Sequence, residues 1–176
     1  EYSVWKPKGF LFLSLKLPTA PSGYESTEPL QTDSYGKGFY QLGIGSLFVK
    51  RIRSFELLLS PSVVGYRPES YFLDGENRKI EPGLSGIFRY GVTYFFKKQP
   101  LQVSAQHVLR YDDKTKIAGL NSSAVSYYQD LILNLNYDFN GYSLSGFYSN
   151  QNVFGPSKNT SLETSVGIQF TSSYDL

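Results

Sequence analysis

The stretch SYYQDLILNLNYDFNGYSLSGFYS, residues 126–149, contains two segments of alternating side chains joined by Asn140-Gly141. In the first segment every second residue from Leu131 to Phe139 is apolar or aromatic, and most residues between them are polar. Strict alternation is typical of a strand with two different faces, and Asn-Gly is the strongest short signal for a hairpin turn. The stretch therefore predicts an antiparallel hairpin of two long strands.

The same alternation recurs along the whole chain, and no segment of helical length has a convincing 3.6-residue period. Several predicted strands exceed ten residues, which is long for a soluble sheet and sufficient for a tilted strand to cross a bilayer. We treat residues 1–176 as a single domain. The predicted strands cover 9–17, 38–49, 54–66, 83–96, 101–111, 126–139, 142–149 and 161–170.

Long and short connections alternate between these strands. The short ones cover 50–53, 97–100 and 140–141, and the long ones cover 18–37, 67–82, 112–125 and 150–160. Outer-membrane barrels show this asymmetry, with long loops outside the cell and tight turns in the periplasm. It predicts that both termini lie on the periplasmic side.

Sorting the strands by parity separates an uncharged face from a charged one. On the uncharged face, Leu, Ile and Val fill much of the middle of the strands, and aromatic rings lie toward both ends. The rings near the short turns or the C-terminal end are Phe48, Phe55, Tyr94, Phe96, Tyr137, Phe139, Tyr142 and Phe170, and those toward the long connections are Tyr40, Tyr111, Tyr127 and Tyr148. Two aromatic girdles around an aliphatic band are typical of a surface in contact with lipid.

We therefore expect an all-β fold, an antiparallel up-and-down transmembrane β-barrel of about 8 strands in this chain. Its location would be the bacterial outer membrane, with membrane lipid around it. A soluble, lipocalin-like barrel that turns the uncharged face inward is the less favoured alternative.

The other face carries the candidate site. The residues predicted to line the lumen or bind a solute are Lys16, Gln41, Glu56, Arg89, Gln106, Arg110, Asp130, Asn134 and Glu163. The interior of an eight-stranded barrel is just filled by side chains, and unpaired buried charge is costly, so an interior closed by salt bridges is the simpler interpretation. The alternative is a selective pathway. Apolar residues on the same face, such as Phe12, Val108 and Phe147, fit a packed interior or the passage of small, partly hydrophobic molecules.

Other classes of function find little support in the composition. The chain has no Cys, one His and a formal net charge of +2, which gives no basis for a disulfide framework, a Cys or His metal site or nucleic-acid binding. No apolar run is long enough for a transmembrane helix. We find no nucleophile, metal site or phosphate loop, so we expect neither an enzyme nor a cofactor.

Two residues depart from the pattern. His107 lies on the uncharged face with no acid beside it, so we expect a bulge that shifts the parity, or a contact with a partner chain or lipid headgroup, rather than catalysis. Pro61 lies inside a predicted strand and cannot donate a ladder hydrogen bond, which predicts a bulge or a local break there.

Several short motifs suggest a family. Leu15-Lys16-Leu17-Pro18-Thr19 is followed by Gly36-Lys37-Gly38-Phe39, and Pro82-Gly83 precedes Phe88-Arg89-Tyr90-Gly91-Val92. These segments resemble the "LPTG" turn, glycine-spaced strand and "FRYG" strand of the outer-membrane phenol meta-pathway transporter family, although Ala20 stands where the family has Gly. The resemblance implies uptake of small molecules. Because family members are usually longer, it leaves open an eight-stranded barrel or part of a 12-stranded one.

Two functions follow from these expectations. The first is a channel or uptake protein for small, partly hydrophobic molecules. The second is a non-conducting structural or interaction barrel, alone or as a subunit of a complex with other outer-membrane proteins.

Overall fold

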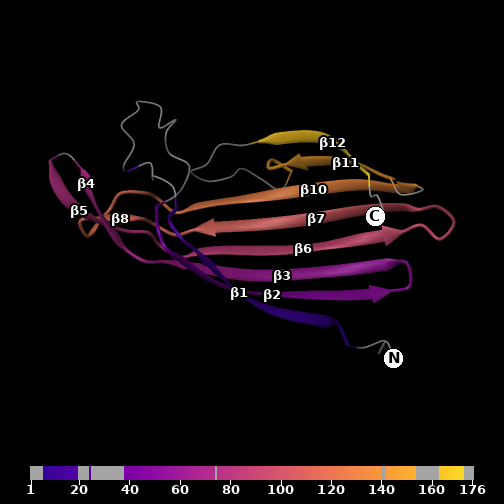
Figure 1. Cartoon of the computed structure of the whole chain (residues 1–176), viewed down its shortest axis with the longest axis horizontal. Helices are drawn as coiled ribbons and strands as arrows, with labels where there is room; N and C mark the ends of the chain where they lie inside the picture. Colours follow the sequence, from indigo (N-terminus) through magenta and orange to yellow (C-terminus); the bar gives the residue numbers. More distant parts are fainter. Residues whose placement is uncertain are drawn as a thin grey trace.

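The chain folds into two antiparallel sheets. The computed structural model describes residues 6–19, 24, 38–73, 75–139, 142–153 and 163–172. The larger sheet has eight strands in the order β1-β2-β3-β6-β7-β10-β11-β12 (Figure 1). These strands are β1 (Lys8–Lys16), β2 (Gln41–Ile52), β3 (Phe55–Tyr66), β6 (Ser85–Phe95), β7 (Leu101–Asp112), β10 (Ser126–Phe139), β11 (Tyr142–Asn150) and β12 (Thr164–Ser172). Within the described ranges, no helix could span a membrane.

The eight strands predicted from alternation are confirmed, each end lying within three residues of its expected position. The predicted short turn at 50–53 is too long, because β2 continues to Ile52 and leaves Arg53 and Ser54 as the turn. Arg53 has a φ of 55° there, in the left-handed region that tight hairpin turns require. The predicted turn at 140–141 and most of the connections 18–37 and 150–160 lie outside the described residues.

The second sheet corrects the expectation that 67–82 and 112–125 are irregular loops. It consists of β4 (Glu69–Leu73), β5 (Glu76–Glu81), β8 (Lys116–Ile117) and β9 (Leu120–Asn121), and it extends beyond the larger sheet at the end of the long connections (Figure 1). Ile80 and Tyr71 pack against Phe39 in a small core, and the Tyr71 hydroxyl donates to the Gly38 carbonyl at 2.7 Å. The sequence signal is weak because β8 and β9 have two residues each and β5 is mostly charged.

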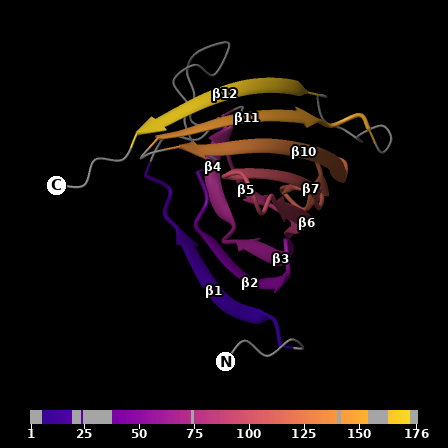
Figure 2. The same ribbon diagram turned by 90° about the vertical axis from the view of Figure 1, so that its right-hand side faces the viewer.

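The larger sheet curls strongly about the direction of its strands (Figure 2). Each strand pairs with the next along the order, and β1 and β12 are the two edges. No pairing joins β1 to β12 among the residues that are described. The sheet therefore has a concave face and a convex face.

The glycines of β6 identify which face is concave. A Cβ built on Gly91 would lie 2.8 Å from the Ala105 carbonyl oxygen, whereas one built on Gly86 would meet nothing within 4 Å. Gly91 shares its face with Arg89, and Gly86 shares its face with Phe88, because side chains alternate along a strand. Crowding on one face and open space on the other indicate that the charged face is concave.

The uncharged face is convex and exposed, as its predicted contact with lipid requires. Its exposed aliphatic residues include Leu11, Leu13, Leu15, Leu42, Ile44, Leu57, Leu59, Val63, Val92, Val103, Leu133, Leu135, Val166 and Ile168. The sorting by parity therefore assigned these residues to the correct side of the sheet.

Pro61 interrupts the ladder without a bulge. Gly45 pairs with Ser62 and Phe48 pairs with Leu59, so both strands have the same number of residues between these pairs. The register with β6 also continues through Pro61, which lies opposite Phe88. The predicted bulge or break in the strand is wrong, because β3 continues through Pro61. Only its pairing with β2 is interrupted there.

Gly91→Ala is expected to destabilise the folded protein by about 1–3 kcal/mol, because the added methyl group meets backbone that cannot move aside. Gly86→Ala, the same substitution on the convex face of the same strand, is the matched control and should change stability by less than about 0.5 kcal/mol. Urea unfolding of both variants measures the difference, and equal effects would contradict the assignment of the two faces.

Candidate functional site

The concave face brings the predicted polar residues into rows that cross the sheet. Arg89 lies opposite Val108, and Val108 lies opposite Asp130 on its other side. Side-chain hydrogen bonds connect neighbouring strands: Asn134 donates to the Ser104 hydroxyl at 3.1 Å, and Ser149 donates to the Asp130 carboxylate at 2.5 Å. Lys16 and Gln41 are cross-strand partners at the end of the long connections.

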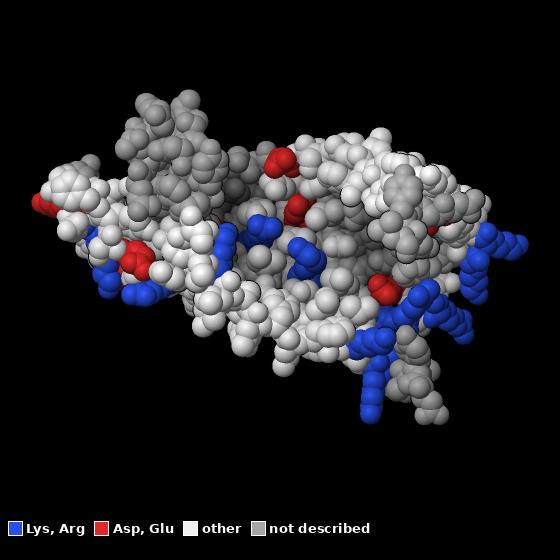
Figure 3. Space-filling model, viewed as in Figure 1, with Lys and Arg blue, Asp and Glu red and all other residues white. Residues whose placement is uncertain are grey.

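Charged side chains gather inside the hollow of the sheet (Figure 3). The side chains of both Arg89 and Arg110 are solvent-exposed. The Arg110 guanidinium carbon lies 5.4 Å from the centroid of the Tyr128 ring, its cross-strand neighbour. This distance fits a cation–π contact that positions the guanidinium without neutralising it.

The interior closed by salt bridges is not what the described residues form. Their ion pairs lie outside the larger sheet and join Arg67 to Glu69, Arg78 to Glu76 and Lys79 to Glu81. The Lys79 ammonium, 2.6 Å from Glu81, lowers the pKa of that carboxyl by hydrogen bonding and by its charge. The candidate charges of the concave face form no ion pair with other described residues, so they remain available to water or a solute.

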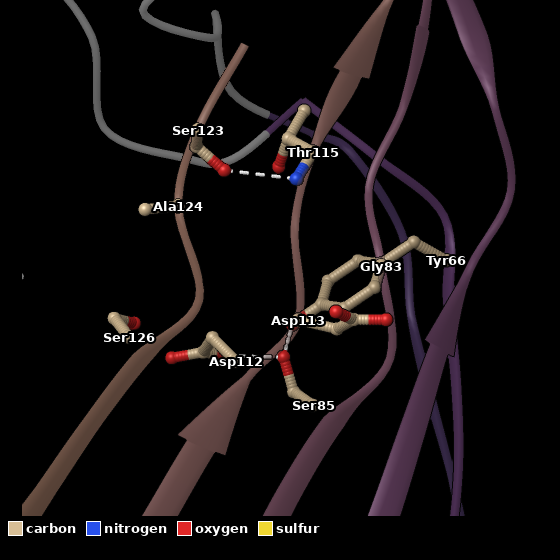
Figure 4. Close-up of a pocket in the computed structure, with 9 residues that line it drawn as sticks. All are labelled: Tyr66, Gly83, Ser85, Asp112, Asp113, Thr115, Ser123, Ala124 and Ser126. Carbon is tan, nitrogen blue, oxygen red and sulfur yellow. Dashed lines mark hydrogen bonds between the residues drawn. The ribbon is translucent and has the colours of Figure 1, made fainter. Parts of the chain in front are cut away.

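A cavity of about 450 Å³ lies at the end of the concave face near the long connections (Figure 4). Its lining consists of Tyr66, Gly83, Ser85, Asp112, Asp113, Thr115, Ser123, Ala124 and Ser126. Ser85 lies opposite Asp112, and Asp112 lies opposite Ser126, so three neighbouring strands end in polar residues on the same face. We call this cavity the mouth pocket.

Hydrogen bonds order one wall of the mouth pocket. Ser85 donates to the Asp112 carboxylate, and the Tyr66 hydroxyl lies 2.8 Å from the Ser85 hydroxyl. Since the Ser85 proton points to the carboxylate, Tyr66 is the donor to Ser85. On the opposite side, the Thr115 backbone N–H donates to the Ser123 hydroxyl at 2.8 Å and connects two parts of the same connection. The carboxylates of Asp112 and Asp113, which also line the pocket, can accept hydrogen bonds from a polar solute.

The mouth pocket is not among the sites predicted from the sequence. Asp112 falls in the predicted connection 112–125 rather than in a strand, and Ser85 carries no charge that would single it out. A signal was nevertheless present: Ser85, Asp112 and Ser126 fall at the same end of three neighbouring strands and have the parity of the charged face.

His107 keeps its place on the convex face, where Nδ1 lies 2.7 Å from the Tyr90 hydroxyl. The pairings of β7 with β6 and β10 continue through His107 without a shift, so the predicted bulge is wrong. His107 is 9% exposed, and its cross-strand partner Tyr90, rather than a catalytic acid, hydrogen-bonds to Nδ1. Contact with a partner chain or a headgroup stays a prediction.

Aromatic rings on the convex face contact one another near the short turns. Phe55 and Tyr94 have ring centroids 4.9 Å apart, and the Tyr94 and Phe96 centroids are 4.8 Å apart. The rings of Phe139, Tyr142 and Phe170 continue the series on β10, β11 and β12, with centroids 5.7 and 5.6 Å apart. The expected girdle at this end is therefore present as two groups of rings in contact.

The comparisons with known proteins give no family for this chain. A scan against models of protein families found no match, and a search of curated proteins found no similar sequence. In the described part of the chain, no group of His, Asp and Glu residues could hold a metal ion.

Proposed function

We propose that the chain forms a closed β-barrel in a bacterial outer membrane and allows small solutes to pass through its interior. The observation that carries this proposal is the inverted distribution of side chains: the exposed convex face is apolar and the charges lie on the concave face. A soluble lipocalin-like barrel would have the opposite distribution, with its apolar residues around the ligand cavity.

Closure of the barrel follows from the cost of unpaired backbone groups in lipid. Each unsatisfied N–H or C=O group in hydrocarbon costs several kcal/mol, so membrane sheets have no free edges. In this sheet β1 and β12 are the edges that need partners, and the curl of the sheet turns them toward the same side (Figure 2). We propose that they pair with each other.

Passage of a solute is supported by the exposed arginines of the concave face and by the mouth pocket above them. Phe12 and Phe147 lie on the same face as Arg110 and Asn134 and are also exposed. A pathway lined by both charges and rings fits small, partly hydrophobic solutes, in agreement with the resemblance to transporters. From the polarity of outer-membrane barrels, we expect the mouth pocket to face the outside of the cell and both termini to lie in the periplasm.

A non-conducting barrel, alone or within an outer-membrane complex, is the second candidate. It is favoured by Val108, which is 3% exposed near the middle of the concave face. A barrel of eight strands has an interior that side chains can fill, so closure of the sheet could block the path around this residue.

Conductance in a planar lipid bilayer decides between the two candidates. We expect discrete current steps after insertion of the purified chain in the absence of any partner. Heat-denatured protein is the control. Insertion without conductance at any voltage would remove the channel and leave the structural barrel.

A further inference from the structure

Resting on the proposed solute pathway, we infer that its interior is a binding site for zwitterionic solutes, in which a carboxylate and an ammonium are several bonds apart. The inference comes from the separation of charge on the concave face. Near the level of Val108, the positive side chains of this face lie on β6 and β7, and the negative ones lie on or beside β10 and β12. Glu56 on β3 and Asp112 at the end of β7 lie nearer the two ends of the sheet.

The positive wall consists of Arg89 and Arg110. Arg89 lies opposite Val108, two residues before Arg110 on the same face of β7, so the two arginines are diagonal neighbours. Residues in this relation have Cα atoms about 7–8 Å apart. Arginine is always charged and binds carboxylates through paired N–H donors, so two neighbouring exposed arginines form a suitable carboxylate site.

The negative wall consists of Asp130 and Glu163. Ser149 of β11 donates to Asp130 at 2.5 Å, from the side opposite to Arg110. Glu163 is positioned through its backbone: its N–H donates to the Gln151 side chain at 3.1 Å, and its carbonyl accepts from the Gln151 N–H at 3.2 Å. Glu163 is an exposed residue, so its carboxylate is open to a solute.

The two walls lie at the same level and form no ion pair with each other. Arg110 lies opposite Tyr128, two residues before Asp130, so these two charges are diagonal neighbours, but the guanidinium contacts the Tyr128 ring instead. Arg89 and Asp130 share a row with Val108 between them, which separates their backbones by about two strand spacings, or 10 Å. Glu163 lies two strands beyond β10, where the curl brings the sheet toward the opposite side of the hollow (Figure 2). Neither arginine forms an ion pair with a described carboxylate. The positive wall and the negative wall can therefore both act on a solute that lies between them.

A solute with both charges gains from both walls. A simple carboxylate would contact the arginines but would be repelled by Asp130 and Glu163, and a simple amine would meet the reverse arrangement. The neutral mouth connections do not favour one sign, because Arg67, Arg78, Lys79, Lys114 and Lys116 balance Glu69, Glu76, Glu81, Asp112 and Asp113 in the described residues there. Selection by charge therefore falls to the two walls.

Calorimetry on the full chain folded in detergent micelles tests this inference without relying on conductance. The probes are 5-aminopentanoate, pentanoate, pentylammonium and 1-pentanol, which share a five-carbon chain. We expect 5-aminopentanoate to bind about tenfold more tightly than pentanoate or pentylammonium, since one added charge-assisted contact is worth about a factor of ten.

Variants of each wall should change the preference in opposite directions. Arg89→Gln with Arg110→Gln should favour pentylammonium over 5-aminopentanoate, and Asp130→Asn with Glu163→Gln should favour pentanoate. Lys79→Gln with Glu81→Gln removes a charge pair outside the larger sheet and should leave the preference unchanged.

Equal or undetectable binding of the four probes to the unmodified chain would overturn the inference, even if the wall variants fail to fold. The proposed function is tested by a different measurement, the conductance, so the two can fail independently. A chain that inserts without conducting but prefers 5-aminopentanoate has the site without the channel, and one that conducts without this preference has the channel without the site.

Discussion

Leu133→Arg is expected to destabilise the protein folded in lipid vesicles by about 2–4 kcal/mol. This is the cost of placing arginine at the bilayer midplane on the outer surface of a barrel. Leu133 is 41% exposed, near the middle of β10 on the convex face. In water the same substitution would place a charge on an already exposed position and would change stability by less than about 0.5 kcal/mol. Urea titration of folding into vesicles gives the value.

Leu120→Arg is the matched control for this measurement. Leu120 is more exposed than Leu133, at 75%, but lies on β9 in the second sheet, beyond the ends of the barrel strands. A large effect at Leu133 and a small one at Leu120 would show that the convex face meets hydrocarbon. Similar small effects at both positions would remove the membrane from the proposal.

The larger sheet was predictable because one rule determines it. A strand that separates two environments must alternate, so Leu131, Leu133 and Leu135 indicate both its position and its faces. The second sheet follows no such rule. Its strands are short, and Ile80 is fully buried through contacts with Tyr71 and Phe39, which are distant in sequence and could not be matched without coordinates.

The candidate site was predictable only in part for a related reason. Parity placed Arg89, Arg110 and Asp130 on one face, but it does not show how far apart two charges lie. The expectation of salt bridges assumed that charges on one face would meet. The register instead places Val108 between Arg89 and Asp130, and Ser149 hydrogen-bonds to the aspartate from the other side.

A pair of engineered cysteines is expected to form a disulfide between β1 and β12 in the folded chain, because the register across the sheet predicts where these edges meet. A continuous row of pairings leads from Gly9 on β1 through Phe48, Leu59, Tyr90, His107, Leu131 and Asn150 to Thr164 on β12. In a closed barrel the strands are tilted, so a row followed once around the barrel returns to the first strand at a different residue from the one where it began. We call the number of residues between these two points the displacement.

The size of this displacement follows from standard strand geometry. Eight spacings of about 4.8 Å, a tilt of about 35–45° and a rise of about 3.4 Å per residue give a displacement of about 8–11 residues. The displacement must be an even number of residues, because side chains alternate along a strand and residues of the convex face must pair with each other. Leu13 and Ile168 both belong to that face. A displacement of about 8 places Leu13 opposite Ile168, and one of about 10 places it opposite Phe170. Displacement in the other direction would leave β1 and β12 without overlap.

The expected result is therefore an intramolecular disulfide in Leu13→Cys with Ile168→Cys or in Leu13→Cys with Phe170→Cys, but not in both to the same extent. Leu13→Cys with Gln169→Cys is the control, because residue 169 points to the concave face. The chain has no Cys of its own, so non-reducing electrophoresis and thiol labelling report only the new pair. A bond closing so long a loop should stabilise the protein by about 4–5 kcal/mol. Disulfide-linked dimers would show instead that the edges pair between copies, and the absence of any bond would mean that β1 and β12 do not meet.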